Sequence, residues 1–451
     1  MGDINIEMVD LAVERHLELK FRLGLFDNPY VNEGSVMEVF ETPANRQLAR
    51  EIAQKSIVLL KNDGILPLNR NIARLAVIGP GAGEGRMLLG DYSHKSMHDL
   101  AVVEVHPDSM FYNLDPSTIA GDDVEIVSLL EGIKLAVSAD TEVVYEKGVD
   151  PLSDDGGGIP AAVVAAEQAD LVILTLGDKS GLTPECTSGE TRDVSSLDLP
   201  GLQGKLAEAV IETGKPVVLV LTSGRPYAIG GLVEEVGAVL QAWLPGEEGG
   251  NALADVLFGD VNPGGKLPVT FPRSAGQVPI NYDYKPSGMR SHWWVDYVNE
   301  PVTPLFPFGY GLSYTQFEYS NFSLSAEKAR SGDSVDVSVT ISNIGDREGE
   351  EVVQLYVRDE YASIPRPMKA LKGFVRIKLA PGEKKKIVFH LPIDQLAFID
   401  SNLALVLESG RIFVMVGSSS DDNHQCGSFQ ITHDDILPLE KRVFVCPVTV
   451  S

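Results

Sequence analysis

Apolar runs alternate with helical stretches over residues 75–259, and this alternation restricts the possible folds more than any other feature. The apolar runs are LAVIG (75–79), TEVVYEKG (141–148), DLVILTLGD (170–178), PVVLVLTSG (216–224) and VGAVLQAWL (236–244). Stretches with helical periodicity lie between most of them, at 127–138, 159–169, 199–214 and 247–259. Such runs are typical of strands buried on both faces of a parallel sheet. We therefore predict an α/β fold with a mainly parallel, doubly covered sheet, an α/β sandwich.

Two further helices are predicted before this region. Residues 5–24 carry apolar side chains at helical spacing, and Gly24 and Pro29 then end the helix. The next helix is predicted to begin at Thr42-Pro43, where a capping residue precedes a proline in the first turn, and to continue to Gly64.

The pattern changes after Phe317 to short alternating strands, which predict a small antiparallel β-sandwich. The predicted strands are 334–343, 350–359, 369–379, 385–391 and 411–417. Residues 259–316 are rich in proline, glycine and aromatic residues, and we expect them to form an ordered linker between the two regions.

The chain is strongly acidic, and this charge bears on its partners. Its 451 residues include 37 basic and 64 acidic ones, for a formal net charge of −27. A field of this sign repels phosphate backbones and anionic lipids, so we expect neither a nucleic-acid nor a membrane partner. The acidic, amphipathic N-terminal residues show no signal peptide, and localisation stays open between the cytoplasm and, for a truncated chain, export.

Three motifs that suggest other chemistry are incomplete. VIGPGAGEG (77–85) lacks the third glycine of a dinucleotide fingerprint, and TSGRP (222–226) is not a serine-nucleophile elbow. His94 and His98 form a close histidine pair without a third metal ligand, and the three cysteines are widely spaced. We therefore expect no metal site and no cofactor.

An acidic stretch, PECTSGETRDVSSLDLPG (184–201), directly follows the apolar run 170–178. It gathers the carboxylates of Glu185, Glu190 and Asp193. In parallel sheets ligands bind beyond the carboxyl ends of strands, which favours a functional loop. Acids that precede a helix are also common in solvated loops. Position alone leaves both interpretations open.

The segment SGETRDVSSLDLPGLQ (188–203) resembles the acid/base loop of glycoside hydrolase family 3, in which a Glu stands three residues before an Asp-Arg pair. Here Glu190 takes the Glu position and Asp193 the Asp position, whereas Val194 replaces the Arg. The Leu-x-Leu-Pro-Gly-x-Gln segment that follows in the family is matched by Leu197, Leu199, Pro200, Gly201 and Gln203. The resemblance implies that Glu190 is the catalytic acid/base.

We also expect substrate contacts from two groups of residues. Near Glu190 these are Asp193, Arg192 and Glu185. The aromatic stretch RSHWWVDY (290–297) adds Arg290, Trp293, Trp294 and Tyr297, residues that suit sugar recognition and equally suit core or interface packing.

Four more segments resemble the same family in order: 20–30, 55–68, 243–272 and 304–319. They imply that residues 1–40 are the end of a TIM-type barrel, 41–258 an α/β sandwich domain, 259–316 a linker and 317–451 a fibronectin type III-like domain. The family's barrel carries its nucleophile in a Ser-Asp-Trp type motif and a sugar-binding Lys-His pair, and neither motif occurs here. A barrel needs about 250 residues, so we expect it to be missing or supplied in trans.

Two hypotheses follow. In the first, the chain is the C-terminal part of a retaining β-glycosidase that acts on terminal β-linked glucose or xylose of oligosaccharides or glycosides, and it is inactive alone. Asp178, at the end of the run 170–178, is the best in-chain candidate for a substitute nucleophile, although strand-end Asp residues commonly cap turns. In the second hypothesis, the chain is a non-catalytic carbohydrate-binding or scaffold module. The family also makes a homodimer possible.

Overall fold

The computed structural model describes residues 4–102, 124–286 and 296–451, and contacts divide the chain into two units, 1–48 and 49–451. In the first unit, helix α1 (Ile6–Arg22) begins where the Asn5 side chain accepts a hydrogen bond from the amide of Glu7. The predicted helix over 5–24 is therefore confirmed, and it has no buried residue. The short helices η1 (Glu33–Ser35) and α2 (Val36–Val39) follow. Among the described residues, no helix is both long and apolar enough to span a bilayer.

Helix α3 (Pro43–Ser56) ends earlier than predicted, and strand β1 (Val58–Asn62) follows it. The prediction of a helix to Gly64 was wrong because Ile57, Val58, Leu59 and Leu60 are all buried, on both faces of a sheet. A short apolar run fits a buried strand or a buried helix equally well from periodicity alone.

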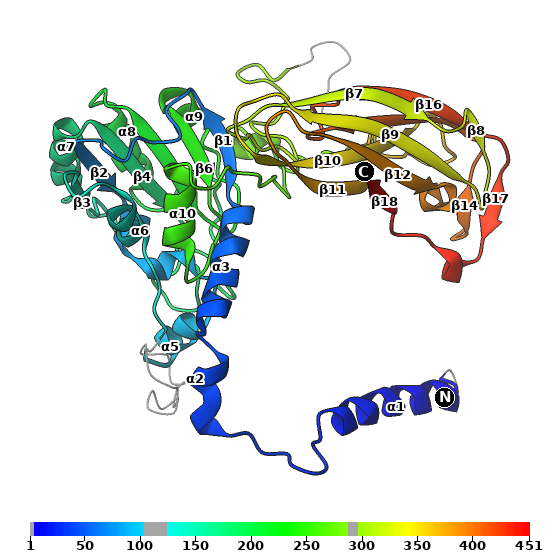
Figure 1. The fold of residues 1–451 in the computed structure, drawn as a ribbon, viewed down its shortest axis with the longest axis horizontal. Coiled ribbons are helices and arrows are strands. Elements are labelled where there is room, and N and C mark those ends of the chain that lie inside the picture. The colour runs from blue at the N-terminus through cyan, green and yellow to red at the C-terminus, as the bar shows by residue number, and fades with distance from the viewer. Residues whose placement is uncertain (1–3, 103–123, 287–295) are drawn as a thin grey trace. The chain divides into compact units, whose positions relative to one another are not determined.

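The second unit contains a six-stranded sheet in the order β1-β6-β5-β4-β2-β3. Its other strands are β2 (Arg74–Ile78), β3 (Glu142–Glu146), β4 (Leu171–Gly177), β5 (Val217–Thr222) and β6 (Ala238–Gln241). All neighbours are parallel except β1, which runs antiparallel to β6 (Figure 1). The predicted mainly parallel sheet is therefore confirmed, with an antiparallel strand at one edge.

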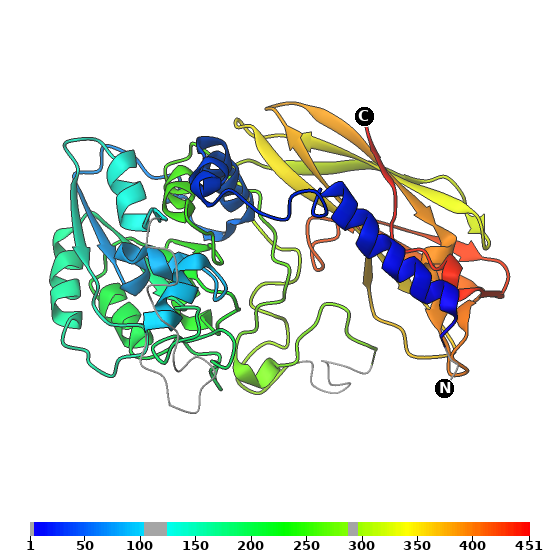
Figure 2. The same cartoon turned by 90° about the horizontal axis from the view of Figure 1, so that it is seen from below.

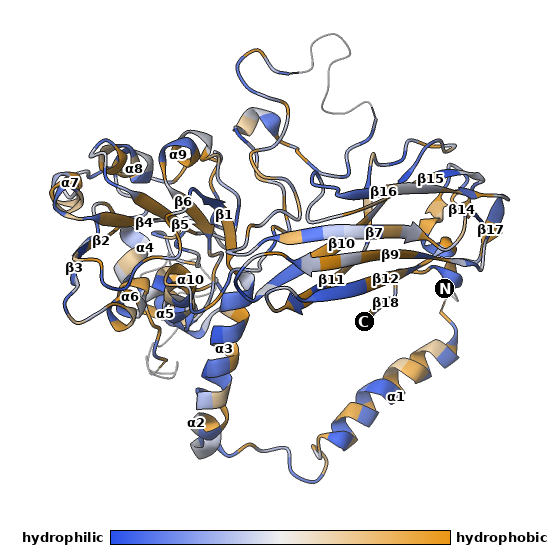
Figure 3. Ribbon diagram, turned by 45° about the horizontal axis from the view of Figure 1, so that its top comes forward, coloured by the Kyte–Doolittle hydropathy of each residue, from blue (hydrophilic) through white to orange (hydrophobic). Residues whose placement is uncertain are grey.

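Helices cover both faces of this sheet (Figures 1 and 2). One core layer holds α7 (Ile159–Gln168), α8 (Gln203–Ile211) and α9 (Gly230–Glu235), and the other holds α3, α6 (Leu129–Ala136) and α10 (Gly249–Leu257). Strand β5 contributes Leu219 and Leu221 to the first layer and Val218 and Val220 to the second, as alternating side chains must. Figure 3 accordingly colours the central strands apolar.

Shorter elements follow β2 at the carboxyl edge of the sheet. They are α4 (Pro80–Gly83), η2 (Gly85–Leu88) and α5 (His94–Val102). Met87 and Leu88 are fully buried, and they fix the path of the chain into the segment 89–93.

In the described parts of the linker segment, residues 259–286 and 296–316, there is little regular structure beyond η4 (Ala275–Gln277), yet these residues are packed on the α/β core. Phe271 and Phe306 are buried and pair through backbone hydrogen bonds. The ring of Phe271 makes edge contacts with Trp243 and Phe306.

The chain ends in a β-sandwich. One sheet has the order β11-β10-β15-β16-β8, and the other has the order β18-β12-β9-β7. The five strands predicted here are confirmed as β9 (Ser334–Asn343), β10 (Gly349–Asp359), β11 (Ala370–Leu379), β12 (Lys384–Pro392) and β15 (Gly410–Gly417). The additional strands are β7 (Phe317–Leu324), β8 (Lys328–Ala329), β16 (Gln425–Ile431) and β18 (Val448–Val450). A small sheet of β13 (Phe398–Ile399), β14 (Leu405–Leu407) and β17 (Asp435–Leu437) completes the domain, with turns η5 (Ile393–Leu396) and η6 (Leu439–Lys441).

Candidate active site

The acidic stretch forms a long loop that leaves the carboxyl end of β4 and returns at α8. Its two limbs pair at their base, where the amide of Gly181 donates to Ser188 O at 2.9 Å and that of Thr187 donates to Lys179 O at 2.9 Å. Cys186 and Thr187 are buried. The base of the loop is therefore a fixed part of the domain, and the residues beyond Ser188 project from it.

Asp178 stands at the start of this loop and is fully buried. Its Oδ1 accepts hydrogen bonds from Thr187 Oγ1 (2.7 Å) and from the hydroxyl of Tyr227. Burial, with the Asp178 carboxylate beside it, raises the pKa of Tyr227, so this phenol stays protonated and donates. A carboxylate that is buried and engaged in this way cannot reach an external anomeric carbon, so Asp178 is unsuited to be a nucleophile.

Arg225 links Asp178 to Asp193, which lies in the descending limb of the loop, the part that leads from Glu190 to α8. Its Nε lies 3.5 Å from Asp178 Oδ2, and its Nη1 donates to Asp193 Oδ1 at 2.5 Å. This guanidinium, together with the amide of Val194, holds the pKa of the Asp193 carboxyl below its usual range. The charge of Asp193 is thus offset, and its position is set by the end of the neighbouring strand β5.

A tight turn carries Glu190 at the tip of the loop. The amide of Arg192 donates to Gly189 O at 3.1 Å, and Thr191 takes a positive φ of 63°. Gly189 has a φ of 129°, and a Cβ there would lie 2.2 Å from Gly181 O. Only glycine fits this position, because both the backbone conformation and the close approach exclude a side chain. The turn exposes Glu190 at the loop's outer end.

Two residues from the segment between η2 and α5 contact Glu190. Its backbone amide donates to Asp91 Oδ2 at 3.1 Å, and the hydroxyl of Tyr92 donates to its Oε2. The hydrogen bond to Glu190 raises the pKa of Tyr92. The carboxylate of Glu190 is thereby oriented on one side and exposed on the other.

Two further predicted residues of the loop, Arg192 and Glu185, make no hydrogen bond to the Glu190 carboxylate among the described contacts. Arg192 donates from Nη2 to Pro184 O at 2.6 Å and from Nε to Cys186 O at 3.3 Å. It therefore closes the loop on itself. Glu185, between those two carbonyls in sequence, is exposed.

The loop ends in a second fixed point at α8. The side chain of Gln203 accepts from the amide of Gly177 at 2.8 Å and donates to its carbonyl at 2.9 Å. Gly201 takes a φ of 59° and packs on the backbone of residues 151–152. The Pro-Gly-x-Gln segment thus fastens the loop to the last residue of β4.

The predicted contacts Arg290, Trp293 and Trp294 lie outside the described residues. Tyr297, the fourth member of that stretch, is 48% exposed. In the described part of the chain, no group of three or more His, Cys, Asp or Glu side chains is arranged to hold a metal ion.

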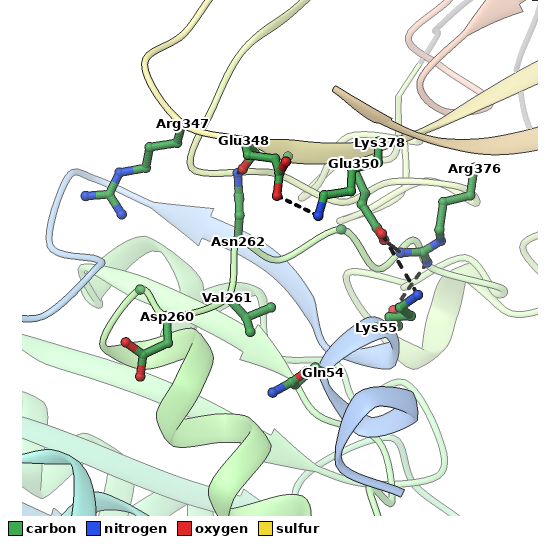
Figure 4. Close-up of a pocket in the computed structure, with 13 residues that line it drawn as sticks. Gln54, Lys55, Asp260, Val261, Asn262, Arg347, Glu348, Glu350, Arg376 and Lys378 are labelled. Carbon is green, nitrogen blue, oxygen red and sulfur yellow. Dashed lines mark hydrogen bonds and ion pairs between the residues drawn. The ribbon is translucent and has the colours of Figure 1, made fainter. Parts of the chain in front are cut away.

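A polar cavity of about 440 Å³ lies elsewhere, between the end of α3, residues 259–264 and the strands β10 and β11 (Figure 4). Its carboxylates are paired with cations: Glu348 with Lys378 at 2.6 Å and Glu350 with Arg376 at 2.8 Å. Asp260, which also lines the cavity, pairs with Arg70, so each carboxylate of the lining has a cationic partner.

Two parts of the chain match family models. Residues 57–314 match the glycosyl hydrolase family 3 C-terminal domain, and residues 351–420 match the fibronectin type III-like domain. The chain belongs to glycosyl hydrolase family 3.

Family 3 relatives agree in sequence and structure. A β-xylosidase of Formosa agariphila is 40% identical over 92% of this chain and 54% of its own length. A periplasmic β-glucosidase of Salmonella typhimurium is 36% identical over 95% and 56%, respectively. The crystal structure of a Listeria innocua β-glucosidase in complex with glucose superposes with a TM-score of 0.78 at 33% identity, over 96% of this chain and 56% of the other. The chain thus spans about half the length of the relatives it matches.

Three residues of the site were missed from the sequence. Arg225 follows β5, the neighbour of β4, and the rule that carboxyl ends of parallel strands meet at one edge could have placed it beside Asp178. Asp91 and Tyr92 carry no such signal. They are almost 100 residues from Glu190 and lie in a segment whose path depends on tertiary packing.

Proposed function

We propose that this chain supplies the general acid/base, Glu190, to a retaining β-glycosidase that cleaves terminal β-linked glucose or xylose. The observation that carries the proposal is the geometry of Glu190: an exposed carboxylate on a fixed loop at the carboxyl edge of a parallel sheet, oriented by Asp91 and Tyr92. The β-glucosidases and β-xylosidases among the relatives suggest the substrate class.

The reaction needs two carboxyl groups about 5–5.5 Å apart. In the first step a nucleophilic carboxylate attacks the anomeric carbon, and Glu190 gives its proton to the departing glycosidic oxygen. A glycosyl ester and a free alcohol result. In the second step the Glu190 carboxylate takes a proton from water, whose oxygen attacks the anomeric carbon and releases the nucleophile.

The nucleophile comes from a second domain in this proposal. Asp178 is buried and bound by Thr187, Tyr227 and Arg225, so it does not fill the role. The family resemblance assigns the nucleophile to a TIM-type barrel, either joined to this sequence in a longer polypeptide or supplied as a separate one. The chain alone is then inactive.

Aryl β-glucoside and aryl β-xyloside turnover tests the proposal, with the purified chain assayed alone and with a separately produced family 3 barrel. We expect turnover only in the mixture, and its loss on Glu190→Gln. Glu208→Gln, an exposed acid of α8, is the matched control and keeps the activity. A mixture whose turnover ignores Glu190→Gln removes Glu190 from the mechanism. A stable complex that binds oligosaccharide without turnover supports a non-catalytic carbohydrate-binding module instead.

A further inference from the structure

The hydrogen bonds of Glu190 divide between its backbone and its side chain. Asp91 holds the amide, and Tyr92 donates to one carboxylate oxygen, Oε2. Both contacts come from adjacent residues of one segment, so a displacement of that segment would move the backbone and the carboxylate of Glu190 together.

The segment that carries Asp91 and Tyr92 is anchored on both sides. Before it, Leu88 is fully buried, and its carbonyl accepts from the amide of Gly246 at 2.9 Å. After it, helix α5 is tied back through Asp99, which accepts from Arg86 Nε at 2.6 Å. Tyr92 is thus presented from a fixed support, although the residue is 66% exposed.

A donor fixed on Oε2 has a chemical consequence for the proton that Glu190 transfers. The phenolic hydrogen occupies Oε2, and the transferable proton then resides on Oε1. A carboxyl group with one oxygen held rotates less, and orientation of the transferring group contributes to general acid–base rates. We propose that Tyr92 is a positioning residue that fixes Oε2 of Glu190 and thereby directs Oε1 toward the glycosidic oxygen, an inference that rests on the proposed function of Glu190.

The contact itself is testable on the chain alone by ultraviolet titration of tyrosine. The difference between wild type and Tyr92→Phe isolates the ionisation of Tyr92. We expect this ionisation above the ordinary value of about 10, and a return toward that value when Glu190→Ala removes the acceptor. Tyr361→Phe, at an 81% exposed tyrosine of the β-sandwich, controls for the loss of one phenol. If Tyr92 ionises at the same pH with and without Glu190, the contact is absent and the proposal is overturned.

The positioning role is tested in the active mixture with the barrel, through kcat/KM for substrates with different leaving groups. Tyr92→Phe should lower kcat/KM for an alkyl β-glucoside by roughly three- to tenfold, the effect of one hydrogen bond to the neutral, protonated carboxyl group. The dinitrophenolate ion leaves a dinitrophenyl β-glucoside without protonation by a general acid. For this substrate kcat/KM should therefore change by less than about twofold. Equal losses for both substrates overturn the proposal, because they show that Tyr92 supports only the fold. If Glu190→Ala lowers kcat/KM equally for the two substrates, the proposed function of Glu190 is contradicted. The titration then still tests whether Tyr92 contacts Glu190.

Discussion

Arg225 is the residue on which the base of the loop most depends. It compensates a fully buried carboxylate, Asp178, and at the same time holds Asp193 on the descending limb. A buried charge without a partner is costly, whereas removal of both charges costs much less.

Arg225→Met should therefore lower the free energy of unfolding of the α/β domain by about 3 kcal/mol. Adding Asp178→Asn to this variant should restore part of the loss, because the uncompensated charge is then gone. Urea unfolding of the two single variants and the double variant measures the coupling between the residues. Strictly additive losses would contradict an interaction between Arg225 and Asp178.

Lys372 is a half-buried cation of strand β11 in the β-sandwich, and we expect it to make stability depend on pH. Burial, with Arg366 and Arg442 nearby, lowers the pKa of Lys372 to about 8. Since a lysine in the unfolded chain has a pKa of about 10.4, the unfolded state binds more protons between these values. The free energy of unfolding should then rise with pH over about pH 8–10, on the order of 2 kcal/mol.

This rise should disappear in Lys372→Met and persist in Lys384→Met, at an exposed lysine of β12. Denaturant unfolding of the three proteins at pH 7.5 and pH 10 measures it. The same pH dependence in wild type and Lys372→Met would show that another group is responsible.

At the scale of elements, the loop between β4 and α8 is held by backbone geometry as much as by side chains. Gly189 allows the turn that presents Glu190, because its φ of 129° and the nearby Gly181 carbonyl exclude a Cβ. A substitution here should act on the presentation of Glu190 and on stability together.

Gly189→Ala should lower the free energy of unfolding by about 2 kcal/mol and reduce turnover in the mixture with the barrel. Gly204→Ala, in helix α8 where a Cβ meets open space, should instead stabilise by about 0.5 kcal/mol. Thermal unfolding and aryl glucoside turnover of both variants test this difference. Equal behaviour of the two variants would contradict the role given to the turn.

The sequence predicted the elements whose periodicity is strong, and it failed where tertiary packing decides. The parallel strands β2, β4 and β5 and five strands of the sandwich were recognisable, whereas β7 and β16 were not predicted. Strand β1 was not, because its apolar run reads equally well as the end of α3. Within the candidate site, Glu190 was predicted through the resemblance of its segment to the family's acid/base loop, whereas Tyr92 is brought to it by the fold alone.

At the scale of the whole molecule, helix α1 is the part least explained by the chain's own contacts. It has 17 residues, and none of them is buried. Its apolar residues Ile6, Val13 and Phe21 are each more than 50% exposed. Isolated helices of about this length are only marginally stable in water. Exposed apolar patches commonly mark interaction sites, so we expect this helix to bind a partner.

We expect the amides of α1 to exchange hydrogen rapidly in the chain alone and slowly once a family 3 barrel is bound. The amides of α10, which is buried within the α/β domain, should be protected in both states. Hydrogen exchange followed by mass spectrometry measures both helices in one experiment. Unchanged rapid exchange of α1 in a catalytically active mixture would contradict a barrel contact with this helix.

The central claim is that Glu190 transfers the proton in a two-step, retaining reaction. Azide tests it directly in the mixture of barrel and Glu190→Ala chain with a dinitrophenyl β-glucoside, because azide attacks the glycosyl ester without help from a general base. We predict slow turnover without azide, acceleration on its addition, and a β-glucosyl azide as the product. Wild-type-like turnover of the Glu190→Ala mixture, with no azide acceleration and no azide product, would contradict the claim.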